Sequence, residues 1–361
     1  MNASTPTLTA RLTELLRKPF VWGVLAILLL LVVNLLKDPS YLAIRVNPTN
    51  GNLAGNVLDI LRASAPIVLV ATGMSLVIAT AGIDLSVGSV MAVAGATSMQ
   101  YLQSADAASS MSAALTAMAM SIALGAVLGM VSGALVAYVG LQPFITTLVM
   151  MLAGRGLAKV ITSGQNTTAT NEQFRWLANG YVGGFPVVFL LALVIAILIM
   201  LVVRRSALGM MILSIGINPR ASRMAGIKPA GLLITVYALS GVLAAIAGMF
   251  AVSSVMTVDV SQTGYQMEMD AILAVVVGGG SLAGGKLSMG GAVVGALLIA
   301  TLDKTVVFLG VPSSATPAFK ATVILVLFLL QADNVRGLLR SRRPRPTLPT
   351  EPVDTKVSVA A

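Results

Sequence analysis

The side chains most able to do chemistry in this chain are the few charged residues that interrupt long apolar stretches. Asp84 is the only charged residue between Arg62 and Asp106. A carboxylate away from water is unfavourable, in a protein core and in a bilayer, unless a cation or hydrogen-bond donors stabilise it. We expect Asp84 to mark a break in the chain, and three roles are open. It caps a helix that begins near Ser86, pairs with a buried cation such as Arg62 or Arg155, or contacts a substrate directly.

Four other charged residues lie inside apolar stretches or at their edges. Arg155, flanked by glycines, lies deep in one stretch, where it either has a structural partner or borders a substrate path. The Lys159 side chain is expected to extend to the interface on the outer side of the membrane that the helix crosses. Glu268 and Asp270 are predicted at the outer mouth of a later stretch, facing a partner protein or water. A proton relay would need acids deep in the bundle, and the sequence offers few.

The stretch GGGSLAGGKLS at 278–288 comes close to a phosphate-binding loop. Such a loop needs Ser or Thr directly after its lysine to hold Mg²⁺, but Leu287 follows Lys286. It also needs a soluble strand, loop and helix around it, and the neighbouring sequence is apolar. We therefore interpret this stretch as a glycine-rich break between two short membrane helices.

The composition excludes several kinds of catalytic and metal site. The chain has no Cys and no His, so thiol nucleophiles, His bases and zinc–thiolate sites are excluded. No cluster of other residues forms a catalytic or metal-ligating motif. We predict no catalytic residue, no metal site and no cofactor.

The same composition indicates a membrane protein. Hydrophobic residues make up 57% of the chain and charged residues only 10%, and the mean hydropathy is +0.93. Soluble domains carry roughly 25% charged residues. We predict an all-α, polytopic membrane helix bundle of about ten transmembrane helices with broken, glycine-rich segments.

Ten apolar stretches approach the roughly 20 residues that a transmembrane helix needs. They are 20–36, 57–80, 86–103, 110–138, 143–163, 185–203, 230–254, 268–283, 288–303 and 318–332. The eighth and ninth are short and glycine-rich, and we expect them to be broken or re-entrant. No small-residue cleavage site follows the first, so we interpret it as a retained span and not as a signal peptide.

The distribution of positive charge predicts an orientation. With a cytoplasmic N-terminus and ten spans, fifteen Lys and Arg residues fall on cytoplasmic segments and four on outer segments. This asymmetry follows the positive-inside rule and places both termini in the cytoplasm. It also accounts for the formal net charge of +10 without a nucleic-acid partner.

The chain divides into a cytoplasmic N-terminal arm (1–19), a transmembrane domain (20–332) and a disordered basic cytoplasmic tail (333–361). The loop 204–229, RRSALGMMILSIGINPRASRMAGIKP, is the most basic internal segment. It contains short helix-forming pieces, and we expect turns at Gly216 and at Asn218-Pro219. It either docks a partner or is a plain positive connector.

Small residues recur at helical spacing in two stretches. Gly125, Gly129 and Gly133 are four residues apart, and Gly241 and Gly248 belong to a similar pattern. Such faces allow close helix approach, either inside the bundle or between subunits.

One weak internal repeat is visible. AGIDLSVG at 81–88 resembles AGGKLSMG at 283–290. The predicted topology places both segments on the same side of the membrane, which a simple inverted repeat would not predict.

Several stretches together resemble the permease subunits of bacterial ABC importers for monosaccharides, of the ribose and galactofuranose type. They are AGIDLSVGSVMAVAGA (81–96), LQPFITTLVMMLAGRGLAKVIT (141–162), SALGMMILSIGINPRASRMAGI (206–227), YALSGVLAAIAG (237–248) and MDAILAVVVGGGSLAGGKLS (269–288). The resemblance covers most of residues 57–332, and the two terminal segments carry none of it. The Gly-Ile-Asp-Leu-Ser-Val-Gly and Gly-Ile-Asn-Pro-Arg-Ala segments are its most specific parts.

The resemblance implies a permease in the bacterial inner membrane that moves a monosaccharide and is not itself an enzyme. Its implied partners are a cytoplasmic ABC ATPase subunit, a periplasmic sugar-binding protein and a second permease, either another copy or a related chain. It also implies that 206–227 is the coupling segment. By that carry-over, the residues that shape or contact the ATPase docking helix are Gly216, Asn218, Arg220, Ala221 and Gly226.

A sugar pathway needs polar groups that bind weakly enough to release the solute. The candidates for the translocation path are Asp84, Gln142, Thr146, Thr147 and Arg155. Two alternatives stay open: an ABC importer permease for a non-sugar small solute, and a secondary transporter with its own ion or proton site.

Overall fold

The computed structural model describes residues 19–46, 48, 51–105 and 110–331. Within these ranges the protein is a bundle of α-helices, which confirms the all-α prediction. Its β-structure there is limited to three pairs of two-residue antiparallel strands. The predicted arm 1–19, apart from Pro19, and the predicted tail 333–361 lie outside the described residues.

The helices follow the predicted apolar stretches in order. They are α2 (Pro19–Lys37), α3 (Asn56–Ala79), α4 (Val87–Ser104), α5 (Met111–Ala134) continued by a π-helical turn (Leu135–Val139), α6 (Pro143–Ile161), α7 (Glu172–Asn179), α8 (Val187–Arg205), α9 (Ala207–Ile217), α10 (Pro219–Met224), α11 (Pro229–Val255), α12 (Met267–Val277), α13 (Met289–Leu309) and α14 (Thr316–Gln331), the last preceded by a 3-10 turn (Ser313–Ala315). The strand pairs are β1 (Arg45–Val46) with β2 (Leu53–Ala54), β3 (Thr167–Thr168) with β6 (Thr257–Val258), and β4 (Tyr181–Val182) with β5 (Phe185–Pro186).

Seven described helices are long and apolar enough to cross a membrane: α2, α3, α5, α6, α8, α11 and α13. The stretch predicted at 288–303 is therefore a complete span and not a short one, because α13 continues to Leu309. The stretch predicted at 268–283 is broken, as expected: α12 has only 11 residues and ends at Val277, just before the run of glycines. The last stretch forms the 16-residue α14.

The stretch 86–103 forms α4, which has 18 residues and includes Gly, Ser, Thr and Gln. Its residues are buried without interruption from Val87 to Met99. Because neighbouring helices and not lipid surround it, α4 does not need the apolar surface of a lipid-facing span. The average hydropathy of a sequence window therefore underestimates how deeply such a helix is buried.

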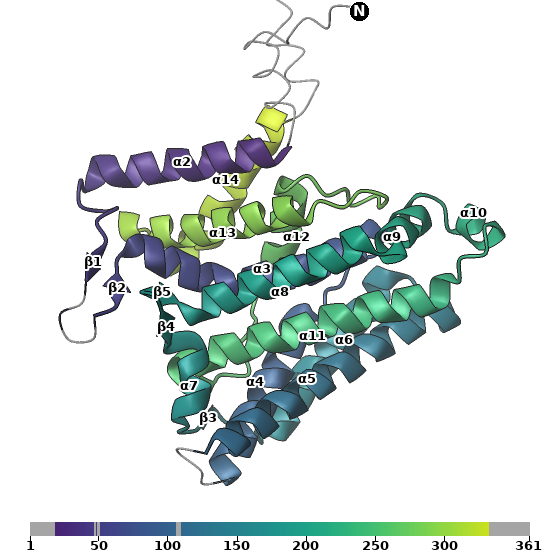
Figure 1. Cartoon of the computed structure of the whole chain (residues 1–361), viewed down its shortest axis with the longest axis horizontal. Helices are drawn as coiled ribbons and strands as arrows, with labels where there is room; N and C mark the ends of the chain where they lie inside the picture. The colour runs from purple at the N-terminus through teal and green to yellow at the C-terminus, as the bar shows by residue number, and fades with distance from the viewer. Residues whose placement is uncertain (1–18, 47, 49–50, 106–109, 332–361) are drawn as a thin grey trace, which may run out of the picture.

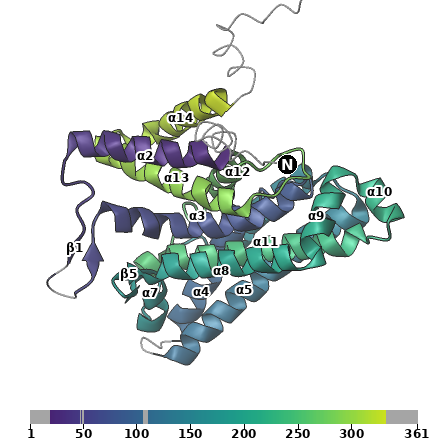
Figure 2. The ribbon, with the colours of Figure 1, turned by 45° about the horizontal axis from the view of Figure 1, so that its top comes forward.

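The long helices run between two ends of the molecule (Figure 1). One end carries α9 and α10, and we call it the α10 end. The opposite end carries α7 and the pairs β1–β2 and β4–β5, and we call it the strand end. The turned view keeps the two groups at opposite ends (Figure 2).

Glycines allow a close helix contact between α5 and α11. A Cβ atom at Gly125 would lie 2.6 Å from the Cβ of Ala245, and one at Gly129 would collide with the carbonyl oxygen of Tyr237. A Cβ at Gly133 would lie 2.7 Å from the Cα of Ile234. The small-residue face is thus packed inside the bundle, which confirms the first of the two predicted roles.

A group of ion pairs connects the last three helices. The Lys320 ammonium on α14 lies 3.1 Å from the Asp270 carboxylate on α12 and 2.8 Å from that of Asp303 on α13. The side chains of Lys320 and Asp270 are each 15% exposed. Asp270 therefore has a partner within the chain, whereas a partner protein or water was predicted for it.

Candidate translocation and coupling sites

Asp84 lies in the linker 80–86, where the chain leaves α3 and enters α4. It is 1% exposed. Its Oδ1 accepts hydrogen bonds from the backbone N–H of Ser86 at 3.0 Å and from the Ser86 hydroxyl, and its Oδ2 accepts one from the Ser240 hydroxyl at 2.8 Å. The carboxylate thus fixes the residue that precedes α4 and connects it to α11.

Neither arginine considered as a partner pairs with Asp84. Arg62 donates to the hydroxyl of Tyr181 at 2.7 Å, at the strand end. Arg155 donates to the carbonyl oxygens of Val260 and Thr263, at 3.1 and 2.6 Å. Hydroxyl and backbone donors stabilise the carboxyl group of Asp84 in their place, as buried polar groups require.

The threonines predicted on the path contact backbone. Thr147 is fully buried, and its hydroxyl donates to the carbonyl oxygen of Ile83, next to Asp84, at 3.0 Å. The hydroxyl of Thr146 donates to the carbonyl oxygen of Gln142 in the preceding turn, at 3.1 Å. The structure thus brings Thr147 to the Asp84 linker, where it connects α6 to the break.

Gln142 and Arg155 lie away from that group. Gln142 precedes α6 and is exposed, whereas Arg155 is half-buried beside the loop that leads into α12. The five path candidates therefore do not form one cluster. Asp84 and Thr147 hold the break, and Gln142 and Arg155 lie toward the two ends of α6.

Glu268 is a polar residue whose surroundings the sequence did not reveal. It was predicted to face a partner or water, but its Oε2 is buried and accepts no hydrogen bond in the described structure. This oxygen lies 2.5 Å from where a Cβ of Gly88 would be, so α12 begins directly against the start of α4. In the sequence, Gly88 indicates this contact, because only a glycine at that position leaves space for the Glu268 side chain.

The coupling segment forms two helices joined by one residue. The Oδ1 of Asn218 accepts hydrogen bonds from the backbone N–H groups of Arg220 and Ala221, both at 3.0 Å, which caps α10. Pro219 occupies the first position of α10, where its missing N–H is not needed. The predicted turn at Asn218-Pro219 is confirmed, and α10 presents its Arg220, Arg223 and Met224 side chains as exposed groups.

The two glycines of this segment have different roles. The predicted turn at Gly216 is wrong, since Gly216 is helical in the last turn of α9 and buried. A Cβ there would collide with the carbonyl oxygen of Ala79 at the end of α3. Gly226 follows α10 with φ of +84° and open space around it, so it forms the turn back toward α11.

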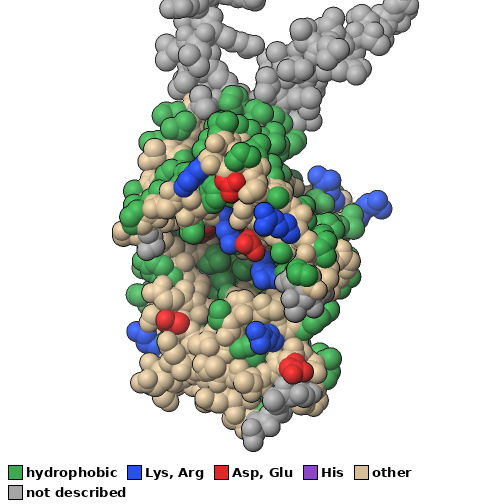
Figure 3. Space-filling view, turned by 90° about the vertical axis from the view of Figure 1, so that its left-hand side faces the viewer, with side chains coloured by type: hydrophobic (Ala, Val, Ile, Leu, Met, Phe, Trp, Pro, Cys, Tyr) green, Lys and Arg blue, Asp and Glu red, His purple; other side chains and the backbone are tan. Residues whose placement is uncertain are grey.

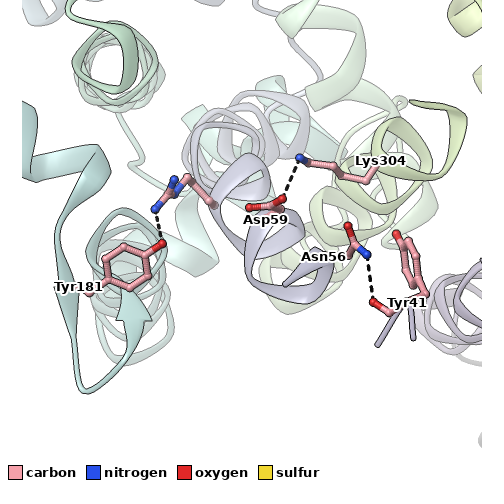
Figure 4. Close-up of polar contacts among 6 residues, drawn as sticks. Tyr41, Asn56, Asp59, Tyr181 and Lys304 are labelled. Carbon is pink, nitrogen blue, oxygen red and sulfur yellow. Dashed lines mark hydrogen bonds and ion pairs between the residues drawn. The ribbon is translucent and has the colours of Figure 1, made fainter. Parts of the chain in front are cut away.

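The strand end carries side chains of both charges around a hollow whose interior is hydrophobic (Figure 3). At this end, Lys304 on α13 lies 3.5 Å from Asp59 on α3, and the Asn56 amide donates to the carbonyl oxygen of Tyr41 at 3.1 Å (Figure 4). These contacts hold the first turn of α3 between α13 and the chain that follows α2.

Residues 56–332 match the family described as "Branched-chain amino acid transport system / permease component". No solved structure matches the chain significantly.

Three curated relatives match over nearly their full lengths. The chain is 51% identical to the fructose import permease protein FruF of Bifidobacterium longum, over 90% of this chain and 91% of that protein. It is 38% identical to the galactofuranose transporter permease protein YtfT of Escherichia coli, over 89% and 92%. It is 36% identical to the ribose import permease protein RbsC of Escherichia coli, over 85% and 92%.

The family match covers most of the chain, and the structure has seven helices able to span a membrane among its described residues. The chain belongs to this family of transport-system permease components and is a multi-pass membrane protein.

Proposed function

We propose that this protein is the permease subunit of an ATP-driven importer that moves a monosaccharide into a bacterial cell. The observation that carries the proposal is full-length similarity to permeases named for fructose, galactofuranose and ribose. The family's general description names branched-chain amino acids, but the relatives named for sugars match nearly the whole chain. Fructose is the first candidate, because the relative named for it is 51% identical.

The two ends of the bundle take different partners in this proposal. The α10 end faces the cytoplasm and an ABC ATPase subunit, and the strand end faces the periplasm and a sugar-binding protein. The basic residues of the loop 204–229, which contains the coupling segment, support this orientation: Arg204, Arg205, Arg220, Arg223 and Lys228. Both termini are then cytoplasmic, in the inner membrane.

The proposed ATPase contact is α10. The helix is short, and the Asn218 side chain caps its first turn. Its last residue, Met224, is apolar and yet 91% exposed. An exposed apolar side chain beside two exposed arginines fits a protein partner better than it fits water. Gly216 supports this contact from inside the bundle, and Gly226 sets the exit from α10.

A second permease, a copy of this chain or a related one, completes the proposed pathway. α6 supports this part, because it exposes Phe144, Ile145, Val149 and Leu152 along one side. In this arrangement Gln142 and Arg155 are the polar groups nearest an opening path, while Asp84 and Thr147 hold the helix break beside it.

Uptake in cells distinguishes this function from a secondary transporter. We expect labelled fructose, galactofuranose or ribose to accumulate only when the permease, ATPase and binding protein are expressed together. Replacing the catalytic carboxylate of the ATPase should abolish uptake. Uptake that survives this change and collapses only with an uncoupler would instead establish an ion-driven transporter, and accumulation of a non-sugar solute alone would establish the other alternative.

A further inference from the structure

The glycine-rich loop 278–288 is the motif that the proposed function leaves unexplained. It leaves α12, returns to α13 and lies between the ends of α3 and α9. Within the loop, Gly284 N–H donates to the carbonyl oxygen of Ser281 at 2.9 Å, and the Ser288 hydroxyl donates to that of Gly278 at 2.9 Å. The loop therefore has a fixed shape of its own.

Three chain segments meet at this loop through their backbones. Gly285 N–H donates to the carbonyl oxygen of Ala79, the last residue of α3, at 2.9 Å. A Cβ on Gly216 of α9 would collide with the same oxygen and would lie 2.6 Å from the nitrogen of Gly285. Since no flexible side chain separates the three segments, a displacement of one must move the others.

The glycines of the loop are required by this contact. Gly284 has φ of +84°, and a Cβ there would lie 2.7 Å from the Cβ of Ala81. Gly285 has φ of +69°, and a Cβ there would lie 2.5 Å from Cγ1 of Ile217. The two segments of the internal repeat, 81–88 and 283–290, thus lie against each other.

The end of α3 is also connected to α6 and α11, the helices that contact the break at Asp84. Directly after Ala79 and Ala81, the Ile83 carbonyl oxygen accepts from Thr147 on α6, and the Asp84 carboxylate accepts from Ser240 on α11. The route from α9 to α6 and α11 is continuous: it runs through the backbone contacts at Ala79, along the chain to Ile83 and Asp84, and through one part-buried and one buried hydrogen bond.

We propose that loop 278–288 is a positioning element that transmits movement of the coupling segment to the Asp84 linker. The proposal rests on the proposed function and extends it. It assigns the ATPase contact to α10 and the transmission step to Gly284, Gly285 and Ile217. It also gives a reason why a sequence so close to a phosphate-binding loop carries glycines for contact and no Mg²⁺-binding hydroxyl after Lys286.

The experiment compares Gly285→Ala with Gly290→Ala in the reconstituted permease, ATPase and binding-protein complex. Gly290 is the matched control, because a Cβ there meets nothing within 4 Å. We expect Gly285→Ala to keep ATPase binding and ATP hydrolysis within about twofold, since α10 is untouched. Sugar uptake per ATP hydrolysed should fall at least tenfold, and Gly290→Ala should keep the wild-type ratio.

A second pair of variants keeps the test decisive if Gly285→Ala does not assemble. Ile217 packs on the loop, and Ile217→Ala removes that contact. Because Ile217 is 73% exposed, we expect the variant to fold. It should lower uptake per ATP severalfold. Met224→Ala, on α10, should weaken ATPase binding and leave the ratio unchanged.

Two results would overturn the proposal. One is a wild-type uptake-to-ATP ratio in the assembled Ile217→Ala and Gly285→Ala complexes. The other is loss of ATPase binding by Ile217→Ala to the same extent as by Met224→Ala, which would make Ile217 a docking residue only. A wild-type complex without ATP-driven sugar uptake is a different failure, since it removes the proposed function itself.

Discussion

At the scale of single residues, Asp84 shows how a carboxyl group is held inside an apolar bundle. Its two carboxyl oxygens accept from Ser86 and Ser240, and no cation is within ion-pair distance in the described residues. A buried polar group left without such partners is unfavourable by about 1–3 kcal/mol. Asp84 therefore connects α11 to the start of α4 through hydrogen bonds and without a salt bridge.

The substitutions Asp84→Asn and Asp84→Leu separate this role from simple packing. Asn keeps an acceptor for Ser86 and an amide that Ser240 can accept from, so we expect near-normal folding and modest loss of uptake. Leu leaves the Ser86 N–H and the Ser240 hydroxyl without partners, at about 1–3 kcal/mol for each group. The measurement is the amount of folded protein in membranes and its melting temperature in detergent. Full stability of the Leu variant would contradict the hydrogen-bonding role.

The sequence was sufficient to predict a break at Asp84 but not its partners. A single carboxylate between glycines in an apolar run identifies the break, because a continuous membrane helix would leave that charge unpaired. Ser240 lies 156 residues further along the chain, in the mostly apolar helix α11. Which serine reaches the carboxylate depends on tertiary packing, and no local pattern contains that information.

At the scale of elements, close backbone contact decides how the helices pack. The repeated glycines of α5 predicted a close helix contact, and the structure shows that α11 supplies the other side. The position of Gly216 was harder to predict. A glycine next to Asn-Pro is typical of a turn, but here the absence of a side chain serves a contact with α3, which lies far away in sequence.

A matched pair of glycine substitutions tests the α5–α11 contact. Gly129→Ala places a methyl group against the backbone of Tyr237 and Ala238, and overpacking of this kind is unfavourable by about 1–3 kcal/mol. Gly231→Ala, in the first turn of α11, meets nothing within 4 Å and should be neutral or slightly stabilising. Melting temperatures of the two variants give the comparison. Equal effects would show that α5 and α11 do not depend on this contact.

The ion pairs of α14 give a second prediction at this scale. Lys320→Ala leaves the carboxylates of Asp270 and Asp303 close together without a cation. We expect a loss on the order of 2 kcal/mol, below the ~3–5 kcal/mol of a fully buried pair, because the Asp303 side chain is 34% exposed.

Two further variants serve as controls for Lys320. Lys320→Arg should recover most of the stability by restoring the charge. Lys304→Ala breaks a pair whose side chains are 37% and 52% exposed, so it should change stability by about 1 kcal/mol or less. Thermal unfolding in detergent ranks the three. If Lys320→Ala and Lys304→Ala had the same melting temperature, the ion pairs that join α12, α13 and α14 would contribute nothing to stability.

At the scale of the whole molecule, composition and charge predicted the class of protein before any contact was known. Ten apolar stretches and a strongly asymmetric distribution of Lys and Arg point to a polytopic membrane protein, and the bundle confirms its helical nature. The glycines after α12 were enough to predict that the stretch 268–283 is broken. Sequence could not show that α4 is enclosed by other helices, because that depends on how the helices surround one another.

The proposed orientation can be measured directly, because the chain has no native Cys. Single cysteines at Met224, on α10, and at Val182, at the strand end, replace side chains that are 91% and 55% exposed. In cells without the ATPase, a membrane-impermeant maleimide should label Val182→Cys from the periplasm and label Met224→Cys only after the inner membrane is opened. The reverse pattern would invert the proposed topology.

The central claim is that this permease works as part of an ATP-driven sugar importer. The most direct measurement reconstitutes the chain with its ATPase into proteoliposomes, supplies the binding protein outside, and follows labelled fructose, galactofuranose and ribose with ATP inside. We expect accumulation of one of these sugars that requires both ATP and the binding protein. Sugar accumulation that proceeds without ATP, or a complex that hydrolyses ATP yet accumulates none of the sugars, would contradict it.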